Sequence, residues 1–305
     1  MPKPKPLSTG DTVRIVTPAS PLPREKLEFA IGWLEGEGYR VELAKHALDG
    51  GAYIAGSDAQ RASDLQDAFT DPSVGAVLCA RGGYGCARLF PFLDLNRIAA
   101  SGKLFLGFSD VTTLHLALNR CGLPTVHAPM GITLHTPRED WVYESLRRVL
   151  KGDASLPEEA SPAETVVGGV AEGEVTGGCL CLLTDSIGTP NPFEPEGKIV
   201  LIEDVDEKPH RVDAMLTHLL NEGSIRLAAG IVVGEMTRSD EQVDEGIGGR
   251  PWKEIVIERL SPLGIPMVVG FPFGHCPNML SMPLGIRARL DADAGALTYL
   301  EALCE

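Results

Sequence analysis

One serine stands at a position where the sequence could support nucleophilic chemistry. In "KLFLGFSDVTTLHLAL", residues 103–118, Ser109 follows an apolar run and precedes a run with helical spacing. A side chain at such a strand-to-helix junction projects from the carboxyl edge of the sheet, where open α/β sheets bind ligands. The first helical turn would place its unpaired N–H groups beside it. The alternative is a helix cap, because Ser and Asp are favoured caps and G-F-S-D lacks the second glycine of G-x-S-x-G.

A nucleophilic serine requires a base, and the base requires a group that orients it. His275 ends the apolar stretch "VVGFPFGH", a context that delivers a side chain to a sheet edge. His127 in "TVHAPM" ends another strand and competes for the same role. Glu203 ends the apolar run "KIVLIE", where an acid is costly unless it has a partner. Alternatively, the acidic residues of "EDVDE", 203–207, are simply a charged turn before a helix.

A glycine-rich turn provides a third chemical feature. "CARGGYGCARLF", residues 79–90, is expected to form a strand, a turn and a helix. Paired glycines let backbone N–H groups approach a ligand and form an anion-binding nest. The turn could hold a phosphate, stabilise an oxyanion or be no more than a tight turn. It is neither a Walker A motif nor G-x-G-x-x-G.

The elements that must position these residues alternate between strand and helix. Apolar runs of strand length are found at residues 13–18, 40–44, 74–80 and 103–108, with helical patterns between them. This alternation predicts an α/β domain with a mostly parallel sheet over residues 1–150. Residues 151–173 are polar and rich in Pro, Gly, Ala and Glu, which indicates a linker. Residues 174–305 are expected to form a smaller mixed α/β domain that ends in a β-hairpin.

Composition limits the possible functions. The 305 residues carry 42 acidic and 27 basic side chains and a formal net charge of -15, so binding to nucleic acid or an anionic membrane is not expected. No apolar run reaches the roughly 18 residues of a membrane-spanning helix, and the N-terminus lacks the apolar middle of a secretory signal. Seven scattered cysteines favour a reducing cytoplasm. Cys179 and Cys181 are expected to be buried rather than metal-bound, because zinc requires four convergent ligands.

Five motifs in order resemble one known family. These are "TPAS", "RGGYG", "GFSD", "IEDVDEKPHRVDAML" and "GFPFGH", which together extend from about residue 12 to 295. They are similar to the LD-carboxypeptidase family of serine peptidases. That family includes the muramoyl-tetrapeptide carboxypeptidases and the microcin C self-immunity peptidases. The resemblance implies a flavodoxin- or Rossmann-like N-terminal domain and an active site between the two domains.

The resemblance also implies site residues. Ser109, Glu203 and His275 would form a triad of nucleophile, orienting acid and base. The oxyanion hole would be made by the backbone N–H groups of Asp110 and Gly83, with Gly82 as the other candidate glycine. The resemblance implies that the reaction needs no metal and no cofactor. It also implies that the protein is a homodimer.

The implied substrate is the murein stem tetrapeptide, cleaved in the cytoplasm between an L-centre and the terminal D-Ala. Because an acidic enzyme needs a local cation for an acidic peptide, Arg81 is the candidate for a substrate carboxylate. An aminoacyl nucleotide of the microcin type is the alternative substrate. The segment "SIGTPNPFEPEG" disfavours it, because Phe193 is its only aromatic residue for stacking on a base. The residues are also compatible with two different classes of protein, an α/β-hydrolase esterase and a noncatalytic anion-binding protein.

Overall fold

The computed structural model describes residues 3–158, 163–243, 246 and 249–305. The chain divides into two compact units that are not continuous in sequence. The first unit comprises Met1–Ser155, Leu280–Gly285 and Ala302–Glu305, and the second comprises Leu156–Met279 and Ile286–Glu301. One segment of the first unit, Leu280–Gly285, therefore interrupts the second unit, and another, Ala302–Glu305, follows it. The structure has no helix, within the part described, that is long and apolar enough to cross a membrane.

The first unit is built on a six-stranded sheet of order β11-β5-β4-β3-β1-β2. Its strands are β1 (Thr12–Val16), β2 (Arg40–Leu43), β3 (Val74–Cys79), β4 (Leu104–Gly107), β5 (Thr125–His127) and β11 (Met282–Leu284). The first five strands run parallel, and β11 pairs antiparallel with β5. The order 2-1-3-4-5 is that of flavodoxin-like doubly wound folds. The predicted mostly parallel sheet is confirmed.

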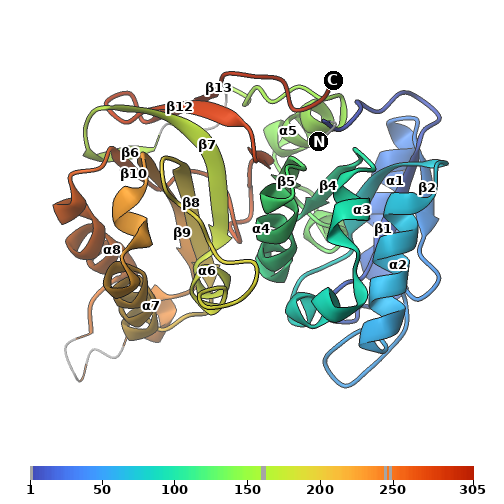
Figure 1. Ribbon diagram of the computed structural model, residues 1–305, viewed down its shortest axis with the longest axis horizontal. Coiled ribbons are helices and arrows are strands. Elements are labelled where there is room, and N and C mark those ends of the chain that lie inside the picture. Colours follow the sequence, from blue (N-terminus) through green and yellow to red (C-terminus); the bar gives the residue numbers. More distant parts are fainter. Residues whose placement is uncertain (1–2, 159–162, 244–245, 247–248) are drawn as a thin grey trace. The chain divides into compact units, whose positions relative to one another are not determined.

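Helices connect the parallel strands of the first unit, and one more, α5, follows the last of them (Figure 1). They are α1 (Glu28–Gly36), α2 (Asp58–Thr70), α3 (Leu95–Ala99), α4 (Thr112–Arg120) and α5 (Asp140–Leu150), with 3-10 turns η1 (Arg24–Lys26), η2 (Cys86–Phe92), η3 (Ser109–Val111) and η4 (Thr133–His135). Ser57 begins α2 with a capping box, in which its side chain accepts from the Gln60 N–H at 3.3 Å and Gln60 Oε1 accepts from the Ser57 N–H at 2.9 Å. These reciprocal bonds satisfy two N–H groups that the helix leaves unpaired.

The second unit holds a seven-stranded sheet of order β13-β12-β7-β8-β9-β10-β6. Its strands are β6 (Glu164–Val167), β7 (Val170–Cys179), β8 (Ile199–Val205), β9 (Gly230–Thr237), β10 (Met267–Val269), β12 (Arg287–Asp291) and β13 (Ala296–Tyr299). Strands β7 to β10 are parallel, and the other three pair antiparallel at the two ends of the sheet. The predicted mixed sheet and terminal hairpin are therefore confirmed.

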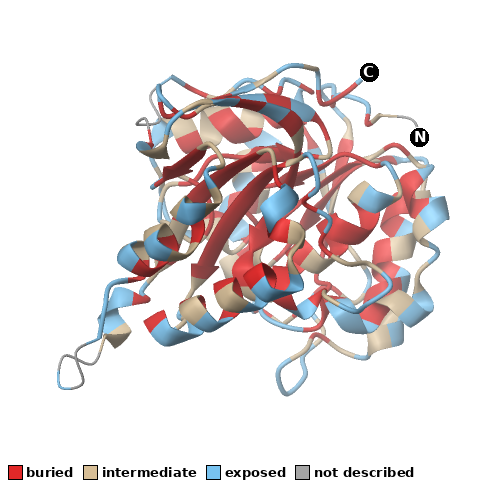
Figure 2. Ribbon diagram, turned by 60° about the vertical axis from the view of Figure 1, so that its left-hand side comes forward, coloured by how far each residue is buried: buried red, intermediate tan, exposed pale blue. Residues whose placement is uncertain are grey.

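The helices of the second unit follow its parallel strands. They are α6 (Leu180–Asp185), α7 (Pro209–Glu222) and α8 (Trp252–Leu260), with 3-10 turns η5 (Ser224–Leu227), η6 (Asp240–Gln242) and η8 (Ser261–Leu263). In both units the central strands are buried along most of their length, whereas the helices alternate between buried and exposed residues (Figure 2). Buried parallel strands account for the near-continuous apolar runs in the sequence.

Two segments differ from their expected structure. The expected linker, residues 151–173, contains β6 and the beginning of β7, although 159–162 lie outside the described residues. Strand β6 gains its hydrogen bonds from β10, about a hundred residues later in the chain, so local composition does not reveal it. The turn after β3 continues as the 3-10 segment η2, which contains Pro91, rather than as an α-helix. Proline lacks the N–H that a regular helix would use at that position.

The capping box makes a testable contribution to stability. We expect Ser57→Ala to lower the free energy of unfolding by about 1 kcal/mol, because the Gln60 N–H at the start of α2 loses its acceptor. Ser63→Ala is the matched control, since Ser63 is an exposed serine of the same helix. Urea unfolding followed by circular dichroism measures both variants. Equal stability of the two variants would show that the cap contributes nothing.

Candidate active site

Ser109 adopts a backbone conformation that few serines adopt. It follows β4 directly and begins η3, with φ at 66°. A non-glycine residue in this left-handed region costs on the order of 1–3 kcal/mol, and the surrounding structure must enforce it. The residue itself is half-buried, between buried Phe108 and buried Asp110. The local geometry is that of a strained strand-to-helix elbow that presents one hydroxyl group.

The glycine turn after β3 packs directly against this serine. A Cβ placed on Gly82 would lie 2.7 Å from Ser109 Cβ, 2.9 Å from Ser109 Oγ and 3.3 Å from the Asp110 nitrogen. Any side chain there would force the serine or the turn to move. Glycine at this position therefore lets the backbone of the turn approach the hydroxyl of Ser109.

Backbone donors are available around Ser109. Among the described residues, the amide N–H groups of Gly82, Gly83 and Asp110 donate to no protein acceptor. Gly83 has φ at 111°, and a Cβ there would collide with Ser20 Oγ. The turn thus provides unpaired donors of the kind that stabilise a developing oxyanion. Gly82 is the glycine in contact with Ser109, and the choice of donor glycine stays a prediction.

Two residues to which the sequence analysis assigned no role hold the glycine turn in place. Ser20, the serine of "TPAS", donates its N–H to the Gly82 carbonyl at 3.3 Å, and its Oγ accepts the Tyr84 N–H at 3.2 Å. Arg61, 2% exposed, donates to the Gly85 carbonyl at 3.0 Å and also to the Pro18 carbonyl. In the sequence, Arg61 stands among the positions of α2 that face the core, and this was the feature that could have revealed a buried arginine.

The carboxylate of Asp110 fixes the other side of the turn. Asp110 is 3% exposed, and its Oδ2 accepts the Cys86 N–H at 2.8 Å. Burial raises the pKa of this carboxyl, while hydrogen bonds from the Cys86 and Gly85 backbones oppose the rise. The residue after the serine therefore clamps the loop that lies beside the serine.

Arg81 also bonds within the turn. Its Nε donates to the Gly82 carbonyl at 3.1 Å, and its Nη1 donates to the Pro21 carbonyl at 3.2 Å. Two parts of the guanidinium group therefore support the loop backbone, and Nη2 is the remaining nitrogen that could face a ligand. A substrate contact by Arg81 stays a prediction.

In the second unit, Glu203 and His275 form a close pair. Glu203 lies in β8 and is fully buried. Its Oε2 is 2.7 Å from His275 Nδ1 and accepts the His275 backbone N–H at 3.2 Å. A proton on Nδ1 directed at the carboxylate leaves Nε2 as the basic nitrogen. Glu203 thus orients the imidazole of His275, which is what the predicted triad requires of these two residues.

The backbone just before the histidine allows this contact. Gly274 has φ at 95°, and a Cβ there would lie 2.5 Å from Glu203 Oε2 and 2.6 Å from Glu203 Cγ. Gly234, in β9, would similarly bring a Cβ within 2.6 Å of the Phe273 carbonyl oxygen. Small residues at both positions let the loop that carries His275 lie directly on the ends of β8 and β9.

The charges around His275 keep it basic. Burial lowers its pKa, but the charge of Glu203 and the hydrogen bond to it, with smaller contributions from Asp204 and Asp206, raise the pKa above the usual histidine value. A histidine with this environment can accept a proton and is stabilised once charged.

Two other histidines are core residues. His115 is fully buried, with Nε2 2.8 Å from the Gly107 carbonyl oxygen and Nδ1 2.9 Å from Thr125 Oγ1, and burial lowers its pKa to about 3. His127, the competing base, is also fully buried, and its ring packs against Phe108 with centroids 5.3 Å apart. The structure thus places Ser109 beside Gly82 and Asp110, and places Glu203 beside His275.

An ion pair at the ends of β8 and β9 was not expected from the sequence, which indicated a solvated turn. Asp206 and Arg238 both have φ at 61°, and they pair through Nε and Oδ1 at 2.7 Å and through Nη2 and Oδ2 at 2.5 Å. Two strained residues that hold each other at the same sheet edge as His275 are a feature typical of functional sites.

The fold and these residues define a class: a two-unit α/β protein with the residue types of a serine hydrolase. Comparison with family models is more specific. Residues 13–128 match the LD-carboxypeptidase N-terminal domain, and residues 172–290 match the LD-carboxypeptidase C-terminal domain. The chain belongs to the LD-carboxypeptidase family, as the five motifs indicated. An α/β-hydrolase esterase is therefore not supported.

Individual relatives span nearly the full chain. The "Probable murein peptide carboxypeptidase" of Bacillus subtilis is 37% identical and is matched over 95% of this chain and 91% of its own length. The murein tetrapeptide carboxypeptidase of Pseudomonas aeruginosa is 33% identical over 92% of this chain and 93% of its own. The solved structure of the wild-type microcin C7 self-immunity protein MccF is 25% identical, with a TM-score of 0.88 and 99% of both chains covered.

The Glu203–His275 contact predicts a change in histidine titration. We expect Glu203→Gln to lower the pKa of His275, because the charge of Glu203 is removed while the effect of burial stays. Histidine NMR titration in a buffer with chelator measures the shift, and exposed His218 is the internal reference. An unchanged His275 titration would contradict the pairing.

Proposed function

We propose that the chain is a serine LD-carboxypeptidase that removes the terminal D-Ala from murein stem tetrapeptide during cell-wall recycling. The observation that carries the proposal is the buried Glu203 in contact with His275 Nδ1 at 2.7 Å. A fully buried acid that orients an imidazole is expensive unless it has a role. The similarity to relatives named murein peptide and murein tetrapeptide carboxypeptidases supports the choice of substrate.

The proposed reaction begins when Ser109 Oγ attacks the carbonyl carbon of the bond between the L-centre and D-Ala. His275 Nε2 takes the hydroxyl proton, and Glu203 stabilises the imidazolium that forms. The proton then passes to the amine of the leaving D-Ala, and the peptide stays on Ser109 as an ester. Water hydrolyses the ester with His275 again as the base. The proposal requires that His275 of the second unit reach Ser109 of the first.

Backbone donors would stabilise the tetrahedral intermediate. The proposed set is the N–H of Asp110 with that of Gly83 or Gly82, groups that donate to no acceptor within the described chain. Removing one such donor typically costs about 3 kcal/mol of transition-state stabilisation. The proposal includes no metal and no cofactor in this reaction, because the nucleophile, base and oxyanion donors are all protein groups.

The cellular setting is also proposed. Seven scattered cysteines favour the cytoplasm, where recycled murein peptides would be met. The acidic chain needs a cation for the substrate carboxylates, and Nη2 of Arg81, beside the glycine turn, is the proposed contact. A homodimer is proposed from the family resemblance.

An aminoacyl-nucleotide peptidase is the second candidate, favoured by the likeness to MccF. That function would need an aromatic ring exposed for stacking on a nucleobase. In residues 186–197 the one aromatic side chain, Phe193, is only 4% exposed. The segment therefore offers no stacking surface, and the murein peptide is preferred.

Mass spectrometry of defined stem tetrapeptides tests the proposed function. Wild type should release one alanine from a peptide with an L-configured centre before D-Ala, and none from the D-configured diastereomer. Ser109→Ala should lower this rate by at least about 1000-fold, because the nucleophile is lost. Ser63→Ala, a change of an exposed serine, should retain full activity. Excess EDTA should leave the rate unchanged.

Other outcomes of that assay would each reject part of the proposal. Release from no stem peptide would overturn the murein assignment, and turnover of an aminoacyl sulfamoyl nucleotide would then support the second candidate. Full activity in Ser109→Ala would overturn the nucleophile, and loss of activity in EDTA would overturn metal independence.

The glycine turn gives a second prediction for the same assay. We expect Gly82→Ala to lower kcat about 100-fold or more, because its methyl group would displace Ser109 from the oxyanion donors. Gly32→Ala is the control, since a Cβ at Gly32 meets nothing within 4 Å. Wild-type kcat in Gly82→Ala would show that the close packing does not position the nucleophile.

A further inference from the structure

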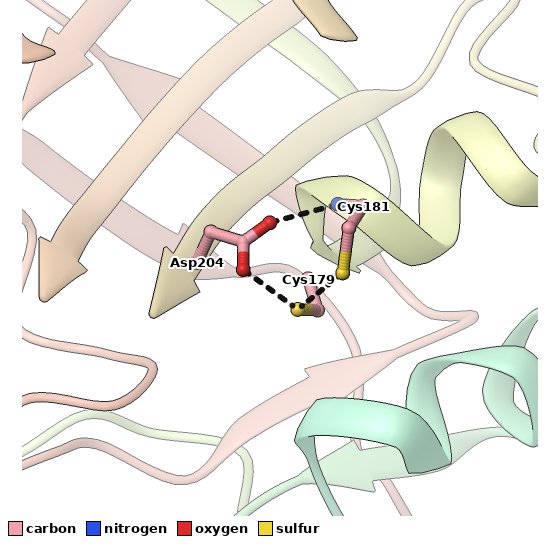
Figure 3. A group of neighbouring side chains, drawn as sticks. All are labelled: Cys179, Cys181 and Asp204. Carbon is pink, nitrogen blue, oxygen red and sulfur yellow. Dashed lines mark hydrogen bonds between the residues drawn. The ribbon is translucent and has the colours of Figure 1, made fainter. Parts of the chain in front are cut away.

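Two thiols and a carboxylate converge beside the Glu203 strand. Cys179 ends β7, Cys181 lies in the first turn of α6, and Asp204 follows Glu203 in β8 (Figure 3). The two Sγ atoms are 3.5 Å apart, and Cys179 Sγ is 3.4 Å from Asp204 Oδ1. One ligand atom from each residue lies within 4.8 Å of the other two. The side chains point toward one common centre.

These distances match the edges of a tetrahedral metal site. Zinc binds thiolate sulfur at about 2.3 Å and carboxylate oxygen at about 2.1 Å. In a tetrahedron with those bond lengths, the sulfur–sulfur edge is about 3.8 Å and the sulfur–oxygen edge about 3.6 Å. The observed 3.5 and 3.4 Å are close to both edges. Only small side-chain shifts would place the three ligands around one ion.

The carboxylate of the cluster is buried. Asp204 is 1% exposed and accepts the N–H groups of Cys181 and Val205, both at 2.8 Å. In the described part of the chain no lysine or arginine pairs with it. Burial and the charge of Glu203 raise its pKa to about 6. A bound cation would stabilise the charged form of this buried carboxylate.

The surroundings of Cys181 favour a cation and allow access. Cys181 is half-buried, whereas Cys179 is buried. The hydrogen bond with Cys179 lowers the pKa of the Cys181 thiol, but burial and the charges of Asp204, Glu207 and Asp185 raise it overall. The carboxylates of Asp204, Glu207 and Asp185 therefore act on Cys181 and would favour a bound cation.

We propose that Cys179, Cys181 and Asp204 bind a zinc-class divalent cation, with water as the fourth ligand. Two thiolates and a carboxylate select borderline-soft ions such as Zn²⁺ over Mg²⁺ or Ca²⁺. Binding releases the two thiol protons to solvent. The sequence analysis predicted that Cys179 and Cys181 are buried without a metal, because it found only these two ligands. The third, Asp204, lies in a strand and is 25 residues after Cys179. The site is separate from the proposed reaction and does not depend on it.

Metal titration of the chelator-stripped full chain tests the proposal. Cd²⁺ should bind one equivalent with a thiolate-to-metal charge-transfer band in the ultraviolet, and Zn²⁺ should displace it. Cys181→Ser and Asp204→Asn should each weaken Cd²⁺ binding at least 10-fold. Cys121→Ser is the matched control, because Cys121 is also a half-buried free thiol. His275→Ala tests another group of the second unit that could bind a metal and should leave the band unchanged.

Three outcomes would overturn the site. One is the absence of the charge-transfer band in wild type at one equivalent of Cd²⁺, a result that needs no variant to fold. Another is wild-type affinity in a folded Cys181→Ser, with folding checked by circular dichroism. The third is loss of the band in Cys121→Ser or His275→Ala, which would assign the metal to other groups.

Discussion

The burial of the Glu203 carboxylate is the constraint on which the second unit depends. A charged group with no exposure to water is unstable in a protein interior unless it is bonded and faces an opposite charge. His275 supplies both through its ring and its backbone N–H. This contact in turn requires glycine at position 274 and a loop that lies directly on the strand ends. The same arrangement raises the pKa of His275, so the need to satisfy one buried acid produces a basic imidazole.

The first unit solves a different problem, which is to hold a serine in a strained conformation. Ser109 stays at φ 66° because the sheet fixes the residues before it, η3 begins at it and the glycine turn packs against it. Ser20, Arg61 and Asp110 hold that turn from three directions. The strain is thus maintained by hydrogen bonds outside the elbow, and unpaired N–H groups are left around the hydroxyl. Such preorganised donors are what acyl-transfer chemistry requires.

Much of the fold and several site positions could be predicted because the signals are local. Buried parallel strands are read as apolar runs, and the Ser57 cap and the terminal hairpin depend on a few neighbouring residues. The family motifs led to the predicted triad of Ser109, Glu203 and His275, of which the structure places Glu203 beside His275. Contacts between distant segments could not be predicted: β6 pairs with a strand far along the chain, and Asp206 and Arg238 are 32 residues apart. Asp204, the third proposed ligand beside Cys179 and Cys181, was missed for the same reason. The structural role of Arg61 was missed because a charged side chain is not expected among the buried positions of a helix.

The central claim is that Ser109 forms the covalent intermediate, and trapping that intermediate tests it most directly. A stem depsipeptide with a D-lactate leaving group would be mixed with the enzyme, quenched in acid within milliseconds, digested and analysed by tandem mass spectrometry. An ester leaving group departs more readily than an amine, so acylation should outpace hydrolysis and the intermediate should accumulate. The account predicts the tripeptidyl mass on Ser109. Turnover accompanied by an adduct on another residue, or retained in Ser109→Ala, would contradict it.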